Sequence, residues 1–130
     1  MPIPESFTDG VRAFSRTNPD QLLSDLDPES ITMIMEEFLA ELPDRLAELP
    51  LLAREGRSEE LSRLAHSLQG IGLSFGLDRF GAKLRELEHF AVTGNKDAID
   101  ALIAKIPSEA VQGVAELRSW ISQLPKQSNS

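Results

Sequence analysis

Residues 58–76 of the chain read SEELSRLAHSLQGIGLSFG, and much of the fold follows from the spacing of their apolar side chains. These recur at intervals of three, four, three and four residues, at Leu61, Leu64, Leu68, Ile71 and Phe75. The repeat is typical of a helix that packs one face against a core. Ser58 is suited to be its N-cap, with acidic residues in the first turn, and Gly76 is suited to be its left-handed stop. The stretch therefore predicts an amphipathic helix.

Similar repeats predict helices on both sides of this one. Asp27 followed by Pro28 is a helix start, because a side-chain acceptor precedes a residue with preset φ. The apolar stripe after it comprises Ile31, Ile34, Phe38, Leu42, Leu49 and Leu52. We expect Pro43 and Pro50 to bend or divide this helix, which should end by Gly56.

Two more helices follow residue 76. The first carries Leu77, Phe80, Leu84, Leu87 and Ala91 and is closed by Gly94 with Asn95. The second carries Ile99, Leu102 and Ile106, is interrupted at Pro107, and resumes with Val114, Leu117, Ile121 and Leu124. Nothing in the sequence reads as a strand.

Four amphipathic helices joined by short loops predict an all-α fold, an antiparallel up-down four-helix bundle over residues 27–124. A lead over residues 1–26 precedes it, with short helical segments expected at residues 11–14 and 19–23. A frayed polar tail is expected over residues 125–130.

Composition narrows the class of protein. A chain of 130 residues, 41% hydrophobic and without cysteine, suits one domain with no thiol nucleophile and no cysteine-bound zinc. The net charge of −8 and pI near 4.7 argue against nucleic-acid binding, which depends on clustered Lys and Arg. No apolar run is long enough to span a membrane, and the first ten residues do not resemble a signal peptide. We expect a cytoplasmic protein with a protein partner.

His66 is the candidate reactive residue. At about 100° per residue it points roughly opposite to the apolar stripe and should face water. Gly70, one turn later, leaves the imidazole uncrowded on that side. An exposed, uncrowded imidazole is a candidate nucleophile.

The run from Ala65 to Leu77 resembles the signature of histidine-containing phosphotransfer (HPt) domains. In that family a histidine is followed by a cation three residues later, a glycine four later, and an apolar residue and glycine nine and ten later. The positions that match in register are His66, Gly70, Phe75 and Gly76. The acid-Pro helix start, the segment from Phe38 to Leu42 that leads into a proline, and the Leu87-Glu88 pair are also similar. The resemblance extends from about residue 27 to the end of the last helix.

The resemblance implies that His66 is the phosphoacceptor of a phosphorelay in a two-component system. It would take a phosphoryl group from the receiver domain of a hybrid histidine kinase and pass it to that of a response regulator. The implied docking face comprises Ser62, Ser67, Leu73 and Gly76. Mg²⁺ is expected on the partner receiver, with no cofactor on this chain. The implied protein is a monomeric carrier with no ATP-dependent kinase activity.

One position departs from the family pattern. Gln69 stands where the family usually has a Lys or Arg, so a neutral amide replaces a charge-assisted donor to phosphoryl oxygens. Arg63, three residues before His66, is our hypothesis for the missing charge. An alternative reading keeps the bundle but makes it a binding module that sequesters a receiver or kinase without efficient transfer.

A metal-binding bundle is the other alternative. Glu86 and His89 have the Glu-x-x-His spacing of di-iron bundles, but such a site needs a second pair and two further inward glutamates. Arg63 precedes His66 where the second glutamate would stand. We therefore expect no metal site and interpret His89 as a surface residue.

Overall fold

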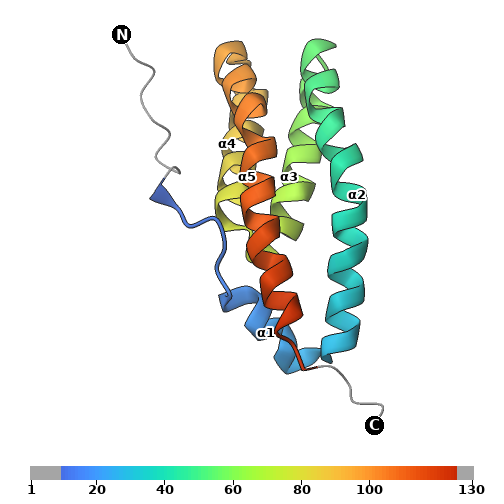
Figure 1. Ribbon diagram of the computed structural model, residues 1–130. Helices are drawn as coiled ribbons and strands as arrows, with labels where there is room; N and C mark the ends of the chain where they lie inside the picture. The colour runs from blue at the N-terminus through green and yellow to red at the C-terminus, as the bar shows by residue number, and fades with distance from the viewer. Residues whose placement is uncertain (1–9, 126–130) are drawn as a thin grey trace.

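The computed structural model describes residues 10–125, and within that range it contains helices and no strand (Figure 1). The helices are α1 (Thr17–Asp25), α2 (Pro28–Arg54), α3 (Ser58–Ser74), α4 (Asp78–Thr93) and α5 (Lys96–Ser122). Apart from Pro125, the expected tail lies outside the described residues, as do the first nine residues of the lead.

The four long helices form the antiparallel up-down bundle that the sequence predicts. The pairs in contact are α2 with α3, α3 with α4, α4 with α5, and α5 with α2, so the helices form a closed ring. Figure 1 shows α1 at the base of the bundle, where α2 begins and α5 ends. Because the connections are short, successive helices lie side by side and run in opposite directions.

Local capping sets the helix boundaries. Asp27 accepts a hydrogen bond from the Ser30 backbone N–H at 2.8 Å, which confirms it as the N-cap of α2. The start of α3 lies one residue earlier than predicted, since Arg57 is the N-cap residue and Ser58 is already helical. Gly76 stops α3 as expected, with φ of 82°. The Leu77 N–H bonds the Gly72 carbonyl at 2.8 Å across this turn.

Internal prolines do not divide the long helices. The helix α2 is continuous through Pro43 and Pro50, and α5 is continuous through Pro107. The predicted interruption at Pro107 is therefore wrong. Each proline removes one backbone donor, and packing of the apolar faces on either side outweighs that local loss.

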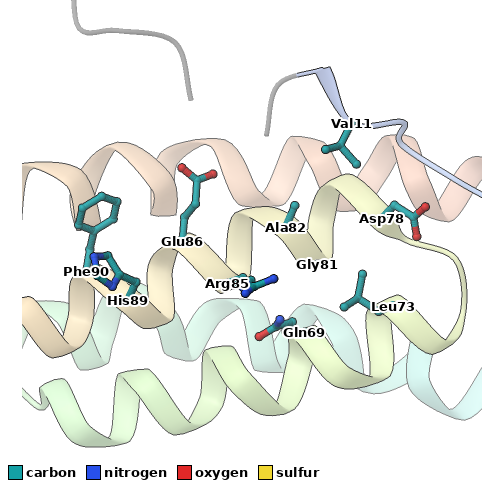
Figure 2. A pocket seen from close by; sticks show the side chains of 10 residues that line it. All are labelled: Val11, Gln69, Leu73, Asp78, Gly81, Ala82, Arg85, Glu86, His89 and Phe90. Atoms are coloured by element: carbon teal, nitrogen blue, oxygen red, sulfur yellow. The ribbon is translucent and has the colours of Figure 1, made fainter. Parts of the chain in front are cut away.

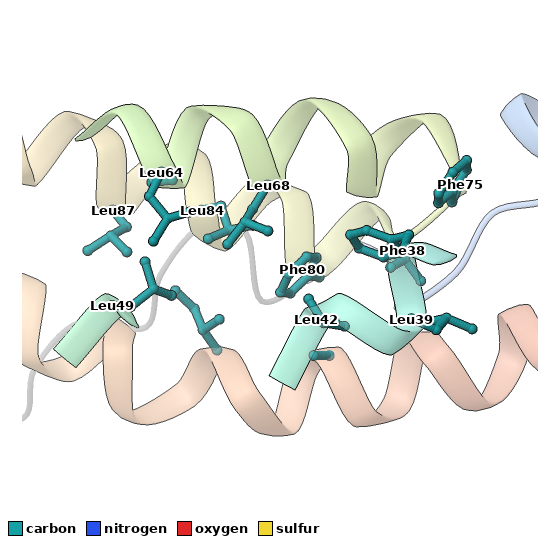
Figure 3. Packing of buried hydrophobic residues seen from close by; sticks show 14 of the residues in the cluster. Phe38, Leu39, Leu42, Leu49, Leu64, Leu68, Phe75, Phe80, Leu84 and Leu87 are labelled. Carbon is teal, nitrogen blue, oxygen red and sulfur yellow. The ribbon is translucent and has the colours of Figure 1, made fainter. Parts of the chain in front are cut away.

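The core fills the space between the four long helices, and Figure 3 shows part of it. Two members of the predicted stripes, Ile34 and Ile71, are instead 44% and 40% exposed. Met35 takes the buried position in α2, and Gly72 takes it in α3. A Cβ on Gly72 would lie 3.0 Å from Phe80 Cδ2, so the bare backbone of α3 packs on that ring and turns Ile71 outward.

The lead is folded onto the base of the bundle. The Ser15 N–H donates to the Gly76 carbonyl at 2.9 Å, and Asn18 Nδ2 donates to the Leu73 carbonyl at 2.9 Å. Trp120 Nε1 donates to Asp20 at 3.0 Å. The predicted helix at residues 11–14 is absent, and these residues form an irregular segment along the bundle. The predicted helical segment at residues 19–23 lies within α1.

Candidate functional site

His66 lies near the middle of α3 and its side chain is 73% exposed. The flanking core residues Ala65 and Leu68 are buried and fix the rotation of the helix. The predicted exposure of the imidazole is therefore confirmed.

The imidazole is held from α4 by a carboxylate. Nδ1 of His66 lies 3.0 Å from Oε2 of Glu88 and 3.2 Å from its Oε1. An ionised carboxylate only accepts hydrogen bonds, so this contact favours the tautomer that carries its proton on Nδ1. The lone pair of the neutral ring then resides on Nε2, which is the ring nitrogen not engaged by Glu88.

Glu88 is the residue of this site whose role sequence reasoning missed. In the sequence, Glu88 is recognised only as part of the Leu87-Glu88 pair that is similar to the HPt family. The missing signal was the register between α3 and α4. Because the two helices form an antiparallel hairpin, positions equally far from the turn at Leu77 face each other, and His66 and Glu88 are each eleven residues from it. Helix periodicity alone does not give this pairing.

Gly70 leaves open space beside the imidazole. A Cβ added there would meet no heavy atom within 4 Å, whereas one added at Gly72, Gly81 or Gly113 would meet side chains. Gly70 is thus not required for packing within the described chain. The space one turn from His66 is free for a partner.

The two flanks of His66 differ in charge. Arg63 and Gln69 are each three residues away, so on a helix they lie about 60° to either side of it. Arg63 pairs with Glu59 at 3.0 Å, toward the start of α3. Gln69 is half-buried on the side of α4, and its Oε1 has no hydrogen-bond partner.

A groove of about 670 Å³ lies along that second flank, between α3 and α4. Its apolar lining includes Val11, Leu73 and Phe90, and its polar lining includes Gln69 and Arg85. Figure 2 shows the side chain of Arg85 on α4 next to that of Gln69 on α3.

A model of the Hpt domain matches residues 33–127, which is most of the chain. The chain belongs to the Hpt domain family. Hpt domains are phosphocarriers of histidine phosphotransfer in phosphorelays and are not kinases, so membership confirms the resemblance drawn from the sequence. No curated protein and no solved structure matches the chain significantly.

The docking residues predicted for this Hpt domain have different surroundings. Ser67 is exposed, Ser62 is half-buried, and Leu73 lines the groove. Gly76 does not lie on the exposed face where the sequence analysis places it. It is buried, and a Cβ on it would lie 2.1 Å from the Ser15 carbonyl oxygen. The lead covers it, so Gly76 has a structural role and is not available to a partner.

One exposed apolar residue near the site was not singled out from the sequence. Val92 is 75% exposed and lies one turn after Glu88 on α4, so it borders the same face of this Hpt domain.

Over residues 10–125, no group of three or more His, Asp or Glu side chains is arranged to hold a metal ion. His89 is exposed and its ring packs edge-on against Phe90, with centroids 5.2 Å apart. In the same range, no helix of this Hpt domain has the length and apolarity to span a membrane.

Proposed function

We propose that this chain is a phosphorelay carrier that accepts a phosphoryl group on His66 from a receiver-domain aspartate and delivers it to another. The donor would be the receiver of a hybrid histidine kinase, and the acceptor that of a response regulator. The observation that supports the proposal most is the exposed imidazole held through Nδ1 by Glu88. It leaves Nε2 free to react, beside the open space at Gly70.

The transfer step follows from this geometry. Nε2 attacks the phosphorus of the aspartyl phosphate, the N–P bond forms, and the O–P bond breaks. The electron pair of the broken bond goes to the receiver carboxylate. Positive charge develops on the ring, and the Glu88 carboxylate stabilises it while the proton stays on Nδ1. Onward delivery is the same step in reverse with a second receiver.

The partner would supply the remaining chemistry. Mg²⁺ on the receiver neutralises charge on the transferring group, and this chain contributes a rigidly placed nucleophile. We propose that it acts as a cytoplasmic monomer without a bound cofactor and without ATP-dependent kinase activity.

The docking face of the proposal surrounds His66 on α3. Gly70 permits close approach, Ser62 and Ser67 offer hydroxyl groups, and Leu73 offers an apolar contact at the groove. Val92 extends this face onto α4.

A second candidate function is sequestration, in which the bundle binds a receiver or kinase without efficient transfer. The observation that favours it is the neutral Gln69 at the position where the family usually has a cation.

Both functions are tested by mixing the protein with a receiver domain charged with labelled acetyl phosphate and Mg²⁺. For the carrier we expect acid-labile, alkali-stable label on this chain that disappears in His66→Gln. His89→Gln is the matched control, since it removes the other histidine, and it should retain the label. A stable complex without label would favour sequestration and contradict the carrier.

A further inference from the structure

The charge around His66 presents a problem for the proposed function, on which this inference rests. A phosphoryl group adds negative charge and strong acceptor oxygens to the ring. Glu88 already places a carboxylate 3.0 Å from Nδ1, and Gln69 adds no positive charge. A cation within reach of Nε2 has to come from elsewhere.

The register of the α3–α4 hairpin identifies one. His66 faces Glu88, and Leu73 faces Gly81, where an added Cβ would lie 2.6 Å from Leu73 Cδ2. Gln69 is three residues after His66, and Arg85 is three residues before Glu88. The same register therefore sets Gln69 opposite Arg85, and both line one groove (Figure 2).

Arg85 is better placed for this role than Arg63. Arg63 is engaged by Glu59 at 3.0 Å. Arg85 is exposed and has no hydrogen bond or ion pair with any residue between 10 and 125. Its guanidinium, on a long flexible stem, stands on the flank where the family cation normally lies.

The amide of Gln69 offers a means of orienting Arg85. Its Oε1 is buried without a hydrogen-bond partner, which is costly unless a donor satisfies it in some state of the protein. A guanidinium has five donor hydrogens, so it can bond this oxygen and still present a donor pair to a phosphate.

We propose that Arg85 is the phosphate-binding cation of this site, supplied from α4 in place of the usual cation on α3, and that Gln69 is its positioning residue. In this arrangement the cation comes from α4 instead of α3, and it lies on the same flank of the histidine.

The test uses the full chain and two donors, the charged receiver and phosphoramidate, a small donor that needs no docking. We expect Arg85→Gln to slow phosphorylation of His66 by at least about tenfold with both donors. Arg85→Lys should retain part of the rate. Far-UV circular dichroism should be unchanged, since Arg85 is exposed.

Two comparisons make the result specific. Arg63→Gln, the matched arginine on the other flank, should leave the rate unchanged. Gln69→Lys should restore the rate in the Arg85→Gln background, because it returns a cation to the same place from α3. An unchanged rate in Arg85→Gln, or a loss of rate in Arg63→Gln instead, would overturn the assignment while leaving the carrier function intact.

The role of Gln69 is tested by a double-mutant cycle. Gln69→Leu should slow transfer when Arg85 is present and have no further effect in Arg85→Gln. Equal effects in both backgrounds would show that Gln69 does not act through Arg85. If the unsubstituted protein takes no label from either donor, the proposed function fails, and the role of Arg85 fails with it.

Discussion

Replacing Gly70 by alanine separates the needs of the folded chain from those of its partner. Glycine within a helix costs about 1 kcal/mol relative to alanine. A Cβ at this position meets nothing within 4 Å, so no steric term offsets the gain. We expect Gly70→Ala to raise the free energy of unfolding by about 1 kcal/mol.

The expected change in melting temperature follows from the size of the chain. With an unfolding entropy of about 2.1 cal/mol/K per residue, a chain of 130 residues has about 0.27 kcal/mol/K in total. A gain of about 1 kcal/mol then raises the Tm by about 4 °C. Differential scanning calorimetry measures both quantities.

Phosphotransfer should change in the opposite direction. A methyl group in a packed contact typically costs about 1–3 kcal/mol, which corresponds to roughly 5- to 150-fold in transfer rate. The assay is the rate of label transfer from a charged receiver. Gly72→Ala is the control in the same helix: its Cβ would lie 3.0 Å from Phe80 Cδ2, so it should lower the Tm. A Gly70→Ala protein that is more stable and transfers at the original rate would refute close approach at this position.

Three further predictions concern other parts of the molecule. Glu88→Gln should slow phosphorylation by about tenfold because a neutral amide stabilises the developing ring charge less; ¹⁵N NMR should show loss of the Nδ1–H preference, and an unchanged tautomer and rate would contradict the role of Glu88. The Arg16 guanidinium, followed by the Trp120 indole N–H, lowers the pKa of Asp20 below its ordinary 3.8, so its stabilising contribution is present at neutral pH and lost as pH falls through the lowered value. Arg16→Ala should therefore shift the acid transition of Trp120 fluorescence to higher pH, and coincident titrations would exclude the effect. Gly76→Ala should destabilise the protein by more than Gly56→Ala, because both have positive φ, worth about 1–2 kcal/mol, but only Gly76 is covered by the Ser15 carbonyl; equal losses in urea denaturation would mean that the covering contact contributes nothing.

The sequence predicts the bundle well because its signals are local. The Asp27-Pro28 start, the stop at Gly76 and the apolar repeats each act within a turn or two of helix. The exposure of His66 follows from the same periodicity.

The errors arise where contacts between distant segments decide the outcome. The apolar spacing places Ile71 in the core, but Phe80 packs on Gly72 and Ile71 is turned outward. The family resemblance places Gly76 on the docking face, and the folding of the lead over it leaves no periodic signal in the sequence that would exclude it. The roles of Glu88 and Arg85 depend on the α3–α4 register, which needs the turn to be located first.

The packing of the lead also affects where a functional fragment can be cut. The family match begins at residue 33, inside α2, whereas Ser15 and Asn18 bond the α3–α4 turn from the chain before it. A graft of the matched segment alone into another protein would leave the backbone carbonyls of Leu73 and Gly76 without these donors. It would also leave the indole N–H of Trp120 without its acceptor, Asp20. Chimeric relay proteins built from this domain should therefore include the lead together with the helices, because the lead supports the hairpin that carries His66.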